Sequence, residues 1–95
     1  MEFEWDPEKA AANKSKHGVD FAEAMSVFGD PLEVTIADPD HSDEEQRFLS
    51  IGSSTSGRLL VVAYTERADR TRIINAREAS PQERKHYEST SPSKR

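Results

Sequence analysis

Five arginines between residues 67 and 84 have the chemistry and the spacing of a phosphate-binding group. A guanidinium offers a planar fork of N–H donors that matches phosphate oxygens, and it keeps its charge when partly desolvated. Several of them around one sheet could hold a nucleic-acid backbone and stabilise the added negative charge of a pentacoordinate phosphate. Strand alternation predicts that two of them share one face, and it places a third on the opposite face together with Ile73 and Asn75. The pair is Arg70 and Arg72, the third is Arg77, and Arg67 and Arg84 complete the group.

The segment Lys16-His17-Gly18 could supply acid–base chemistry. An imidazole accepts or donates a proton near neutral pH, and a neighbouring lysine can bind phosphate. Both features also have structural explanations. Cations at the C-terminal end of a helix interact favourably with its dipole, and the arginines could simply form surface ion pairs with nearby acids. These acids are Glu66, Asp69, Glu78 and Glu83.

Motifs for metals and cofactors are missing from the sequence. The acidic segment Asp38–Glu45 is not an EF-hand loop, because Asp43 occupies the position of the required glycine and Leu49 that of the required glutamate. There is no cysteine, and the three histidines are scattered, which disfavours zinc. Phosphate loops, nucleophile elbows and paired-histidine metalloprotease motifs are absent too. We therefore expect neither a metal nor a cofactor.

Hydrophobic periodicity and capping residues predict eight elements that must position these side chains. Their order, β-α-α-β-β-β-β-α, is typical of an α+β fold with a mainly antiparallel sheet and the helices packed on one side. We expect one domain over residues 1–88, a Ser- and Gly-rich turn over Gly52–Gly57, a tight hairpin over Arg67–Asp69 and a disordered polar tail over 89–95. The predicted strands span 2–6, 32–36, 47–51, 58–66 and 70–77, and the predicted helices span 7–17, 21–28 and 81–88.

Composition sets limits on the class of protein. The chain has 95 residues, of which 33% are charged, and a formal net charge of −5. This length suits one small domain. The longest mostly apolar run, Leu59–Thr65, is far shorter than the roughly 20 residues that cross a bilayer, and the acidic N-terminus does not resemble a signal peptide. We expect a soluble cytoplasmic protein.

The charge is distributed unevenly along the chain. Residues 1–46 carry 13 acidic and 3 basic side chains, a net charge of −10, whereas residues 47–95 carry 5 acidic and 10 basic ones, a net charge of +5. Such asymmetry is a pointer to a polyanionic or charged partner. Two solvated faces of different composition are the alternative.

Many of these residues together form the pattern of one protein family. In this combination the sequence resembles the BrnT-type toxins over about residues 2–88. Asn75 is a mild departure, because serine is commoner in the family at that position. The matching residues are Phe3-Glu4-Trp5-Asp6, Lys9, Asn13, Lys16–Val19, Phe21, Ala24, Val27, Phe28, Asp30, Asp40, His41, Gly52, Leu60–Val62, Thr65–Arg67, Arg72–Ile74, Ala76, Arg77, Glu83, Arg84 and Tyr87.

The resemblance implies a fold similar to that of RelE-like ribonucleases and a role as the toxin of a type II toxin–antitoxin pair. Such a toxin cleaves RNA without a metal ion, through the 2′-hydroxyl of the substrate, and so arrests translation and growth. The implied partner is a BrnA-type antitoxin, in a heterotetramer of two toxins and two antitoxins. Operator DNA would be bound only through that antitoxin, and no membrane is involved.

Together the residues and the resemblance give a hypothesis for the site. Arg67 and Arg77 would hold the scissile phosphate with help from Arg72. His17 or Glu66 would be the base, and Tyr87 or His17 the acid. The catalytic set is therefore His17, Glu66, Arg67, Arg77 and Tyr87, and the set that binds RNA is Lys14, Lys16, Arg47, Arg72 and Arg84.

Two alternatives stay open at the level of sequence. The chain could be an interaction module whose basic face binds an acidic partner or a nucleic acid without cutting it. It could also be an inactive toxin that still sequesters an antitoxin. Cleaved RNA ends and growth arrest on expression distinguish the ribonuclease from both.

Overall fold

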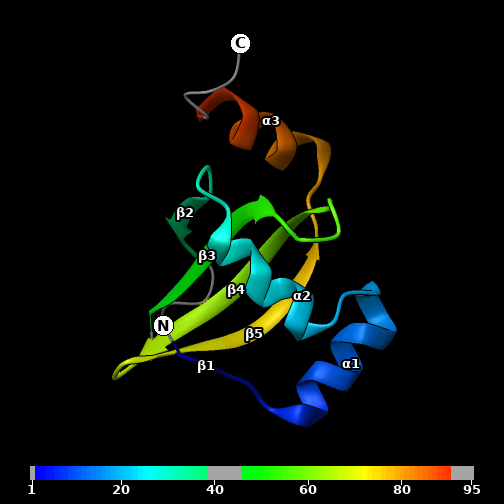
Figure 1. Cartoon of the computed structure of the whole chain (residues 1–95), viewed down its shortest axis with the longest axis vertical. Coiled ribbons are helices and arrows are strands. Elements are labelled where there is room, and N and C mark those ends of the chain that lie inside the picture. The colour runs from blue at the N-terminus through cyan, green and yellow to red at the C-terminus, as the bar shows by residue number, and fades with distance from the viewer. Residues whose placement is uncertain (1, 39–45, 91–95) are drawn as a thin grey trace.

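A computed structural model describes residues 2–38 and 46–90 of the chain, and it contains one five-stranded sheet with three α-helices and a short 3-10 helix (Figure 1). The α+β class predicted from the sequence is confirmed. The elements, in chain order, are β1 (Glu2–Glu4), α1 (Pro7–His17), α2 (Phe21–Met25), η1 (Ser26–Gly29), β2 (Val34–Ala37), β3 (Arg47–Ser53), β4 (Leu59–Arg67), β5 (Arg70–Glu78) and α3 (Pro81–Thr90).

The sheet is mixed, with strand order β1-β5-β4-β3-β2. Strands β2 to β5 form an antiparallel meander, and β1 adds to the outer side of β5 in a parallel register that pairs Glu2 with Arg70 and Glu4 with Arg72. Because β1 is short, it covers only the first part of β5. The second half of that strand is therefore left for α1 to contact.

Local signals in the sequence explain where the helices begin and end. Asp6 caps α1 by accepting a hydrogen bond from the Glu8 amide, and Gly18 ends it with a left-handed φ of 72°. Asp20 caps α2 in the same way, through the Glu23 amide. The predicted second helix changes its form after Met25 and continues as the 3-10 turn η1.

The two faces of the sheet bury different clusters. Alternation along β4 places Leu60 and Val62 on one face and Val61 and Ala63 on the other. The first face, which we call the helix-covered face, packs against α1, α2 and η1 in a core that includes Phe21. The second face, which we call the open face, carries a smaller cluster. It consists of Ile51, Leu59 and Val61, with Leu49, Ala79 and Tyr87 packed against it.

Two expectations about these faces are wrong. The three helices do not all pack on one side, because α3 brings Tyr87 against the cluster of the open face. Arg77 does not share the face of Ile73, because the β4–β5 register shifts between Ala63 and Tyr64 and places one extra residue, Ile74, in β5. This bulge turns the rest of the strand over, so that Arg77 points to the open face. Its predicted partner on that face, Asn75, remains beside it.

Two predicted boundaries also differ from the structure. Strand β3 continues through Gly52, so the turn that follows is shorter than Gly52–Gly57. A Cβ atom at Gly52 would lie 2.8 Å from Cγ1 of the buried Val27, which explains why glycine occupies this position in the strand. Helix α3 extends to Thr90, because the hydroxyls of Ser89 and Thr90 donate hydrogen bonds back to the His86 carbonyl. The rest of the predicted tail, 91–95, lies outside the described residues, as does 39–45 of the acidic loop.

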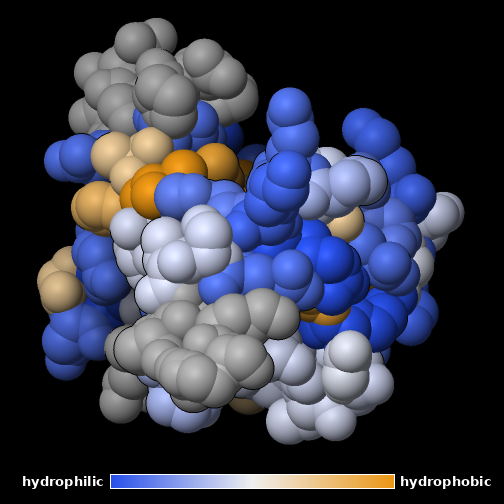
Figure 2. All heavy atoms as spheres, turned by 90° about the horizontal axis from the view of Figure 1, so that it is seen from above, coloured by the Kyte–Doolittle hydropathy of each residue, from blue (hydrophilic) through white to orange (hydrophobic). Residues whose placement is uncertain are grey.

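Basic side chains from the second half of the chain form ion pairs with acidic side chains from the first half. Arg58 of the basic half binds Glu23 of the acidic half, while Arg70 and Arg72 bind Glu4 on the neighbouring strand. The hydrogen bonds from Arg58 lower the pKa of Glu23 to about 2. Much of the asymmetry is thus neutralised inside the molecule. The surface seen from above is mostly hydrophilic, with a small apolar group (Figure 2).

No helix in the described part of the chain combines the length and the apolar character that crossing a membrane requires.

Candidate nucleic-acid interface

Helix α1 is fixed to the edge of the sheet by one buried side chain, Asn13. The amide nitrogen of Asn13 donates to the carbonyls of Ala76 (2.8 Å) and Val19 (2.9 Å), and its amide oxygen accepts from the Ala76 N–H (3.1 Å). The side chain thus continues the hydrogen-bond ladder of β5 beyond the end of β1. Residues on the same stripe of α1 are brought against the open face as a consequence.

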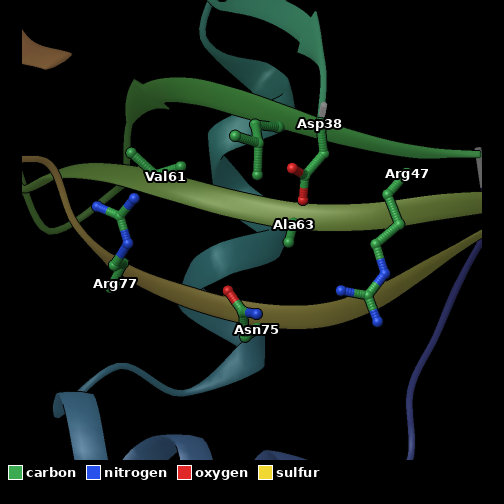
Figure 3. Close-up of a pocket in the computed structure, with 7 residues that line it drawn as sticks. Asp38, Arg47, Val61, Ala63, Asn75 and Arg77 are labelled. Atoms are coloured by element: carbon green, nitrogen blue, oxygen red, sulfur yellow. The ribbon is translucent and has the colours of Figure 1, made fainter. Parts of the chain in front are cut away.

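Two hollows meet on this part of the open face. One, the sheet hollow, has a volume of about 260 Å³, and the other, the helix hollow, about 470 Å³. They share Arg47, Asn75 and Arg77, so together they form one continuous depression. The sheet hollow is further lined by Asp38, Leu49, Val61 and Ala63 (Figure 3). The helix hollow is further lined by Lys9, Ala12, Asn13, Lys16, His17 and Ile74.

Three of the basic side chains around the hollows have no carboxylate partner among the described residues. Within residues 2–38 and 46–90, the cations of Lys9, Lys16 and Arg47 lie in no ion pair with a carboxylate. The ion pairs recorded there involve other basic residues. Three unpaired cations therefore line one depression, which is an arrangement that attracts a polyanion.

Arg77 stands at the junction of the two hollows and is held rigidly. Its Nη1 and Nη2 donate to the two carboxylate oxygens of Glu83 at 2.7 and 2.8 Å, and Nη1 also donates to the Glu78 carbonyl. Glu83 is fixed in turn by the predicted capping box, in which it accepts from the Ser80 amide (2.8 Å). The bonds from Arg77 lower the pKa of Glu83 to about 2. One N–H on Nη2 and the Nε–H of Arg77 stay available for a phosphate.

The structure brings together four of the residues singled out in the sequence. His17, the last residue of α1, lines the helix hollow with Lys16, Arg47 and Arg77. The positions of His17 and Lys16 follow from the Asn13 anchor and from the Gly18 cap, which ends the helix directly after the imidazole. One depression thus contains an imidazole, an ammonium group and two guanidinium groups.

Glu66 and Arg67 lie elsewhere, at the hairpin end of the sheet. Arg67 pairs with Arg70, seven residues before Arg77 along β5, which corresponds to a separation of about 20 Å. Arg67 lines neither hollow. Glu66 pairs with Thr71 and accepts a hydrogen bond from its hydroxyl, on the helix-covered face.

Tyr87 is occupied by a structural contact. Its hydroxyl donates to Oδ2 of Asp30 at 2.6 Å, and the same oxygen accepts from the Ser53 amide. Partial burial, reinforced by the Asp30 hydrogen bond, raises the pKa of Tyr87 to about 12. This tyrosine links α3 to η1 and does not line either hollow.

The remaining residues of the predicted RNA-binding set have carboxylate neighbours. Arg72 donates to Glu4 at 3.1 Å. Lys14 lies 3.9 Å from Asp20, and Arg84 lies 4.0 Å from Glu88 on the same helix. None of the three lines a hollow. Surface pairing, the alternative left open in the sequence, describes these side chains better.

Three residues of the depression were missed as site residues. Lys9 could have been recognised from the sequence as a site residue, because it lies on the same helical stripe as Asn13 and Lys16. Asn75 could also have been recognised, because it lies two residues before Arg77 on the same strand and therefore on the same face of the sheet. Asp38 had no such signal: it is only 7% exposed, and it reaches the sheet hollow because its amide donates to the carbonyl of Arg47, the first residue of β3.

Across 2–38 and 46–90, no three His, Asp or Glu side chains gather closely enough to hold an ion.

Comparisons with known proteins agree with the resemblance seen in the sequence. A sequence model of the family described as "Ribonuclease toxin, BrnT, of type II toxin-antitoxin system" matches residues 5–83. Among solved structures, the fold is similar to the ribonuclease toxin BrnT of Brucella abortus, with a TM-score of 0.63 and 25% sequence identity. That alignment covers 84% of this chain and 97% of the Brucella chain. No curated protein sequence matches the chain.

Proposed function

Because this chain belongs to the BrnT ribonuclease toxins of type II toxin–antitoxin systems, we propose that it cleaves RNA at the depression on its open face. The observation that carries this proposal is the concentration of unpaired cations there, around a fixed arginine and a histidine. Elsewhere in the described structure, most arginines are neutralised by acids of the same molecule.

The proposed reaction uses the 2′-hydroxyl of the RNA as nucleophile and needs no metal ion. A base removes the proton from the 2′-oxygen, which attacks the adjacent phosphorus while the bond to the 5′-oxygen breaks. The leaving oxygen takes a proton, and the products end in a 2′,3′-cyclic phosphate and a 5′-hydroxyl. The protein must align these atoms, move two protons and stabilise the charge of the pentacoordinate phosphate.

Arg77 is the residue we assign to the phosphate. Its pairing with Glu83 fixes the plane of the guanidinium before RNA arrives, so little reorganisation is needed when charge develops. The free donors on Nε and Nη2 can each bind one non-bridging oxygen. Removal of a donor of this kind typically lowers the rate about 100-fold or more.

His17 is the residue we assign to proton transfer from the 2′-hydroxyl. It is exposed at the end of α1 and borders the same hollow as Arg77. Water in the open hollow can protonate the leaving oxygen. Lys9, Lys16 and Arg47 bind the phosphates on either side and hold the strand in place. Glu66, Arg67 and Tyr87 lie outside this proposed centre.

The family also supports a proposal about biological role. RNA cleavage would arrest translation and growth, and a BrnA-type antitoxin would neutralise the toxin in an assembly of two toxins and two antitoxins. Operator DNA would be contacted only by the antitoxin. A gene for a small DNA-binding protein next to the toxin gene is the simplest observation in favour of this role.

Induction in a host without the antitoxin, together with cleavage of purified RNA in the presence of EDTA, tests the proposal. The informative pair of variants is Arg77→Ala and Arg72→Ala. Both remove an arginine from β5 that is paired with a glutamate, but only Arg77 lines the hollows. We expect a rate about 100-fold lower for Arg77→Ala and a change of a few-fold at most for Arg72→Ala. His17→Gln should match the loss in Arg77→Ala.

Several outcomes would overturn the proposal. RNA that is bound but never cut would favour the interaction module, and normal growth with abundant folded protein would favour an inactive toxin. Equal cleavage by Arg77→Ala and Arg72→Ala would move the reactive centre away from the depression. Loss of activity in EDTA would contradict the metal-free reaction.

A further inference from the structure

The proposed cleavage leaves one task without a residue, which is the alignment of the 2′-hydroxyl with the scissile phosphate. The rate of such an attack depends strongly on this alignment, because the reacting atoms must be held about 3–3.5 Å apart and in line. Arg77 is assigned to the phosphate and His17 to the proton, and neither fixes the direction of the 2′-oxygen. A neutral hydrogen-bond donor close to Arg77 is the group that this task requires.

Asn75 is the amide of the depression that is free to bind a ligand. It is exposed and lines both hollows, and no hydrogen bond within residues 2–38 and 46–90 occupies its side chain. The other amide of the depression belongs to Asn13, whose nitrogen donates to the carbonyls of Val19 and Ala76 and whose oxygen accepts from the Ala76 N–H. Asn75 can therefore offer two N–H donors and a carbonyl oxygen to a bound nucleotide.

Small neighbours keep the Asn75 amide accessible. Its partner across the β4–β5 ladder is Ala63, and Ala12 lines the helix hollow on the side of α1. Figure 3 shows the amide between the guanidinium groups of Arg47 and Arg77. A ribose can therefore reach Asn75 while its phosphates lie against the two arginines.

The spacing between Asn75 and Arg77 suits a ribose and its 3′-phosphate. The two residues are two positions apart on β5, so they share a face and lie about 7 Å apart. The bulge at Ile74 precedes both, so the alternation between them is unbroken. A hydrogen bond of about 2.9 Å from the amide to the 2′-oxygen, followed by about 3–3.5 Å from this oxygen to phosphorus, gives a similar length. One nucleotide can therefore contact both side chains.

We propose that Asn75 is a further catalytic residue, which holds the 2′-oxygen of the nucleotide on the 5′ side of the cut. The amide N–H donates to one lone pair of this oxygen, the 2′-hydroxyl donates to His17, and the second lone pair faces the phosphorus. His17 takes the proton as the bond from the 2′-oxygen to phosphorus forms and the bond to the 5′-oxygen breaks. Water protonates the 5′-oxygen, and the remaining hydroxide takes the proton back from His17.

The same contact selects RNA over DNA, because a deoxyribose has no 2′-oxygen for Asn75 to bind. The inference rests on the proposed function, since it assigns the nucleophile of that reaction to a residue.

Two RNAs with one modified ribose test the contact, after the cut position has been mapped in the unmodified RNA. At that position one carries a 2′-amino group, which keeps a donor and an acceptor, and the other is 2′-deoxy. Neither has the attacking hydroxyl, so binding to the full chain is measured without cleavage. We expect the 2′-amino RNA to bind about five-fold more tightly, which is the gain from one hydrogen bond. For Asn75→Ala the two affinities should agree to within about 1.5-fold.

Cleavage of the unmodified RNA gives a second measure. Asn75→Ala should lower kcat about 10-fold or more and raise KM about five-fold at most, because misalignment slows the reaction more than it weakens binding. Gln82→Ala is the matched control, because it removes an exposed carboxamide of α3 that lines neither hollow. The control should keep the kcat of the parent chain and its full preference for the 2′-amino RNA.

Each failure has its own signature. Equal binding of the two modified RNAs by the parent chain refutes the contact without any variant. An unchanged kcat in Asn75→Ala, or a preference for the 2′-amino RNA that persists in this variant, refutes the role of Asn75. A preference that Asn75→Ala alters for the base and not for the sugar makes Asn75 a base-reading residue and also overturns the proposal. These outcomes leave the ribonuclease proposal standing. If the parent chain cuts no RNA, the ribonuclease proposal fails, and the catalytic role of Asn75 is refuted with it.

Discussion

The ion pair between Arg77 and Glu83 should make a stability contribution that depends on pH. Two short hydrogen bonds join the residues, and the pKa of Glu83 falls from 4.5 to about 2. A shift of this size corresponds to at most about 3 kcal/mol. Because the two side chains keep 39% and 27% of their surface exposed, solvent screening reduces the contribution to about 1–2 kcal/mol.

Glu83→Gln is the change that isolates this contribution. Glutamine keeps the shape and can still accept from the Ser80 amide, but it has no charge to offer Arg77. At pH 7, urea unfolding should show a loss of about 1–2 kcal/mol, and the melting temperature should fall by about 5–10 °C. Since the folded-state pKa is depressed, this stability is fully present above pH 4.5 and is lost as the pH falls toward 2.

The difference in the free energy of unfolding between the parent chain and Glu83→Gln should therefore decrease steadily as the pH falls from 4.5 to 2. Glu88→Gln provides the control on the same helix, because Glu88 lies 4.0 Å from Arg84 in an exposed pair. Its effect should stay below about 0.5 kcal/mol at any pH. A gap that is the same at pH 7 and pH 3 would refute the electrostatic explanation and would point to packing at Glu83 instead.

Three further predictions concern stability, measured by urea and thermal unfolding. Gly52→Ala should destabilise the fold by about 1–2 kcal/mol, because the new Cβ atom would press on Val27. Gly29→Ala is the control and should not destabilise the fold, because its new Cβ atom would have no neighbour within 4 Å; equal effects of the two variants would contradict the close packing at Gly52. Ala68→Gly should stabilise by up to about 1 kcal/mol, because Ala68 has a φ of 56°, and a loss of stability would show that the turn is unstrained. Tyr87→Phe should cost about 1 kcal/mol below pH 10, a difference that disappears as the pH rises toward 12, and should leave RNA cleavage unchanged; a large loss of cleavage would restore the tyrosine as a candidate acid.

The candidate site could be predicted only in part from the sequence. Residue types were informative, because the histidine, lysine and arginines that could handle a phosphate were visible from their chemistry alone. Their grouping was not. His17 and Arg77 are 60 positions apart in the chain and line one hollow, whereas Arg67 and Arg77 lie on adjoining strands and stand about 20 Å apart.

The distribution of charge shows the same limit. Counting along the chain suggested an acidic half and a basic face. In the folded molecule, Arg58 and Arg72 find their partners in the acidic half, and Lys9 and Lys16 of that half contribute to the basic depression. Ion pairs form between neighbours in space, so a division by sequence position does not describe the surface.

The sequence by itself determined the elements and their caps: Asp6, Asp20 and Gly18 act within one helical turn, and the Ser80–Glu83 capping box spans four residues. The tertiary structure decided which faces carry function. One bulge at Ile74 reverses the face of Arg77, and the parallel pairing of β1 leaves the edge on which Asn13 anchors α1. Capping and turn formation depend on residues that are close together in the chain, so the sequence predicts them directly. Strand register depends on partners that are distant in the chain, and a single extra residue turns every later side chain to the other face.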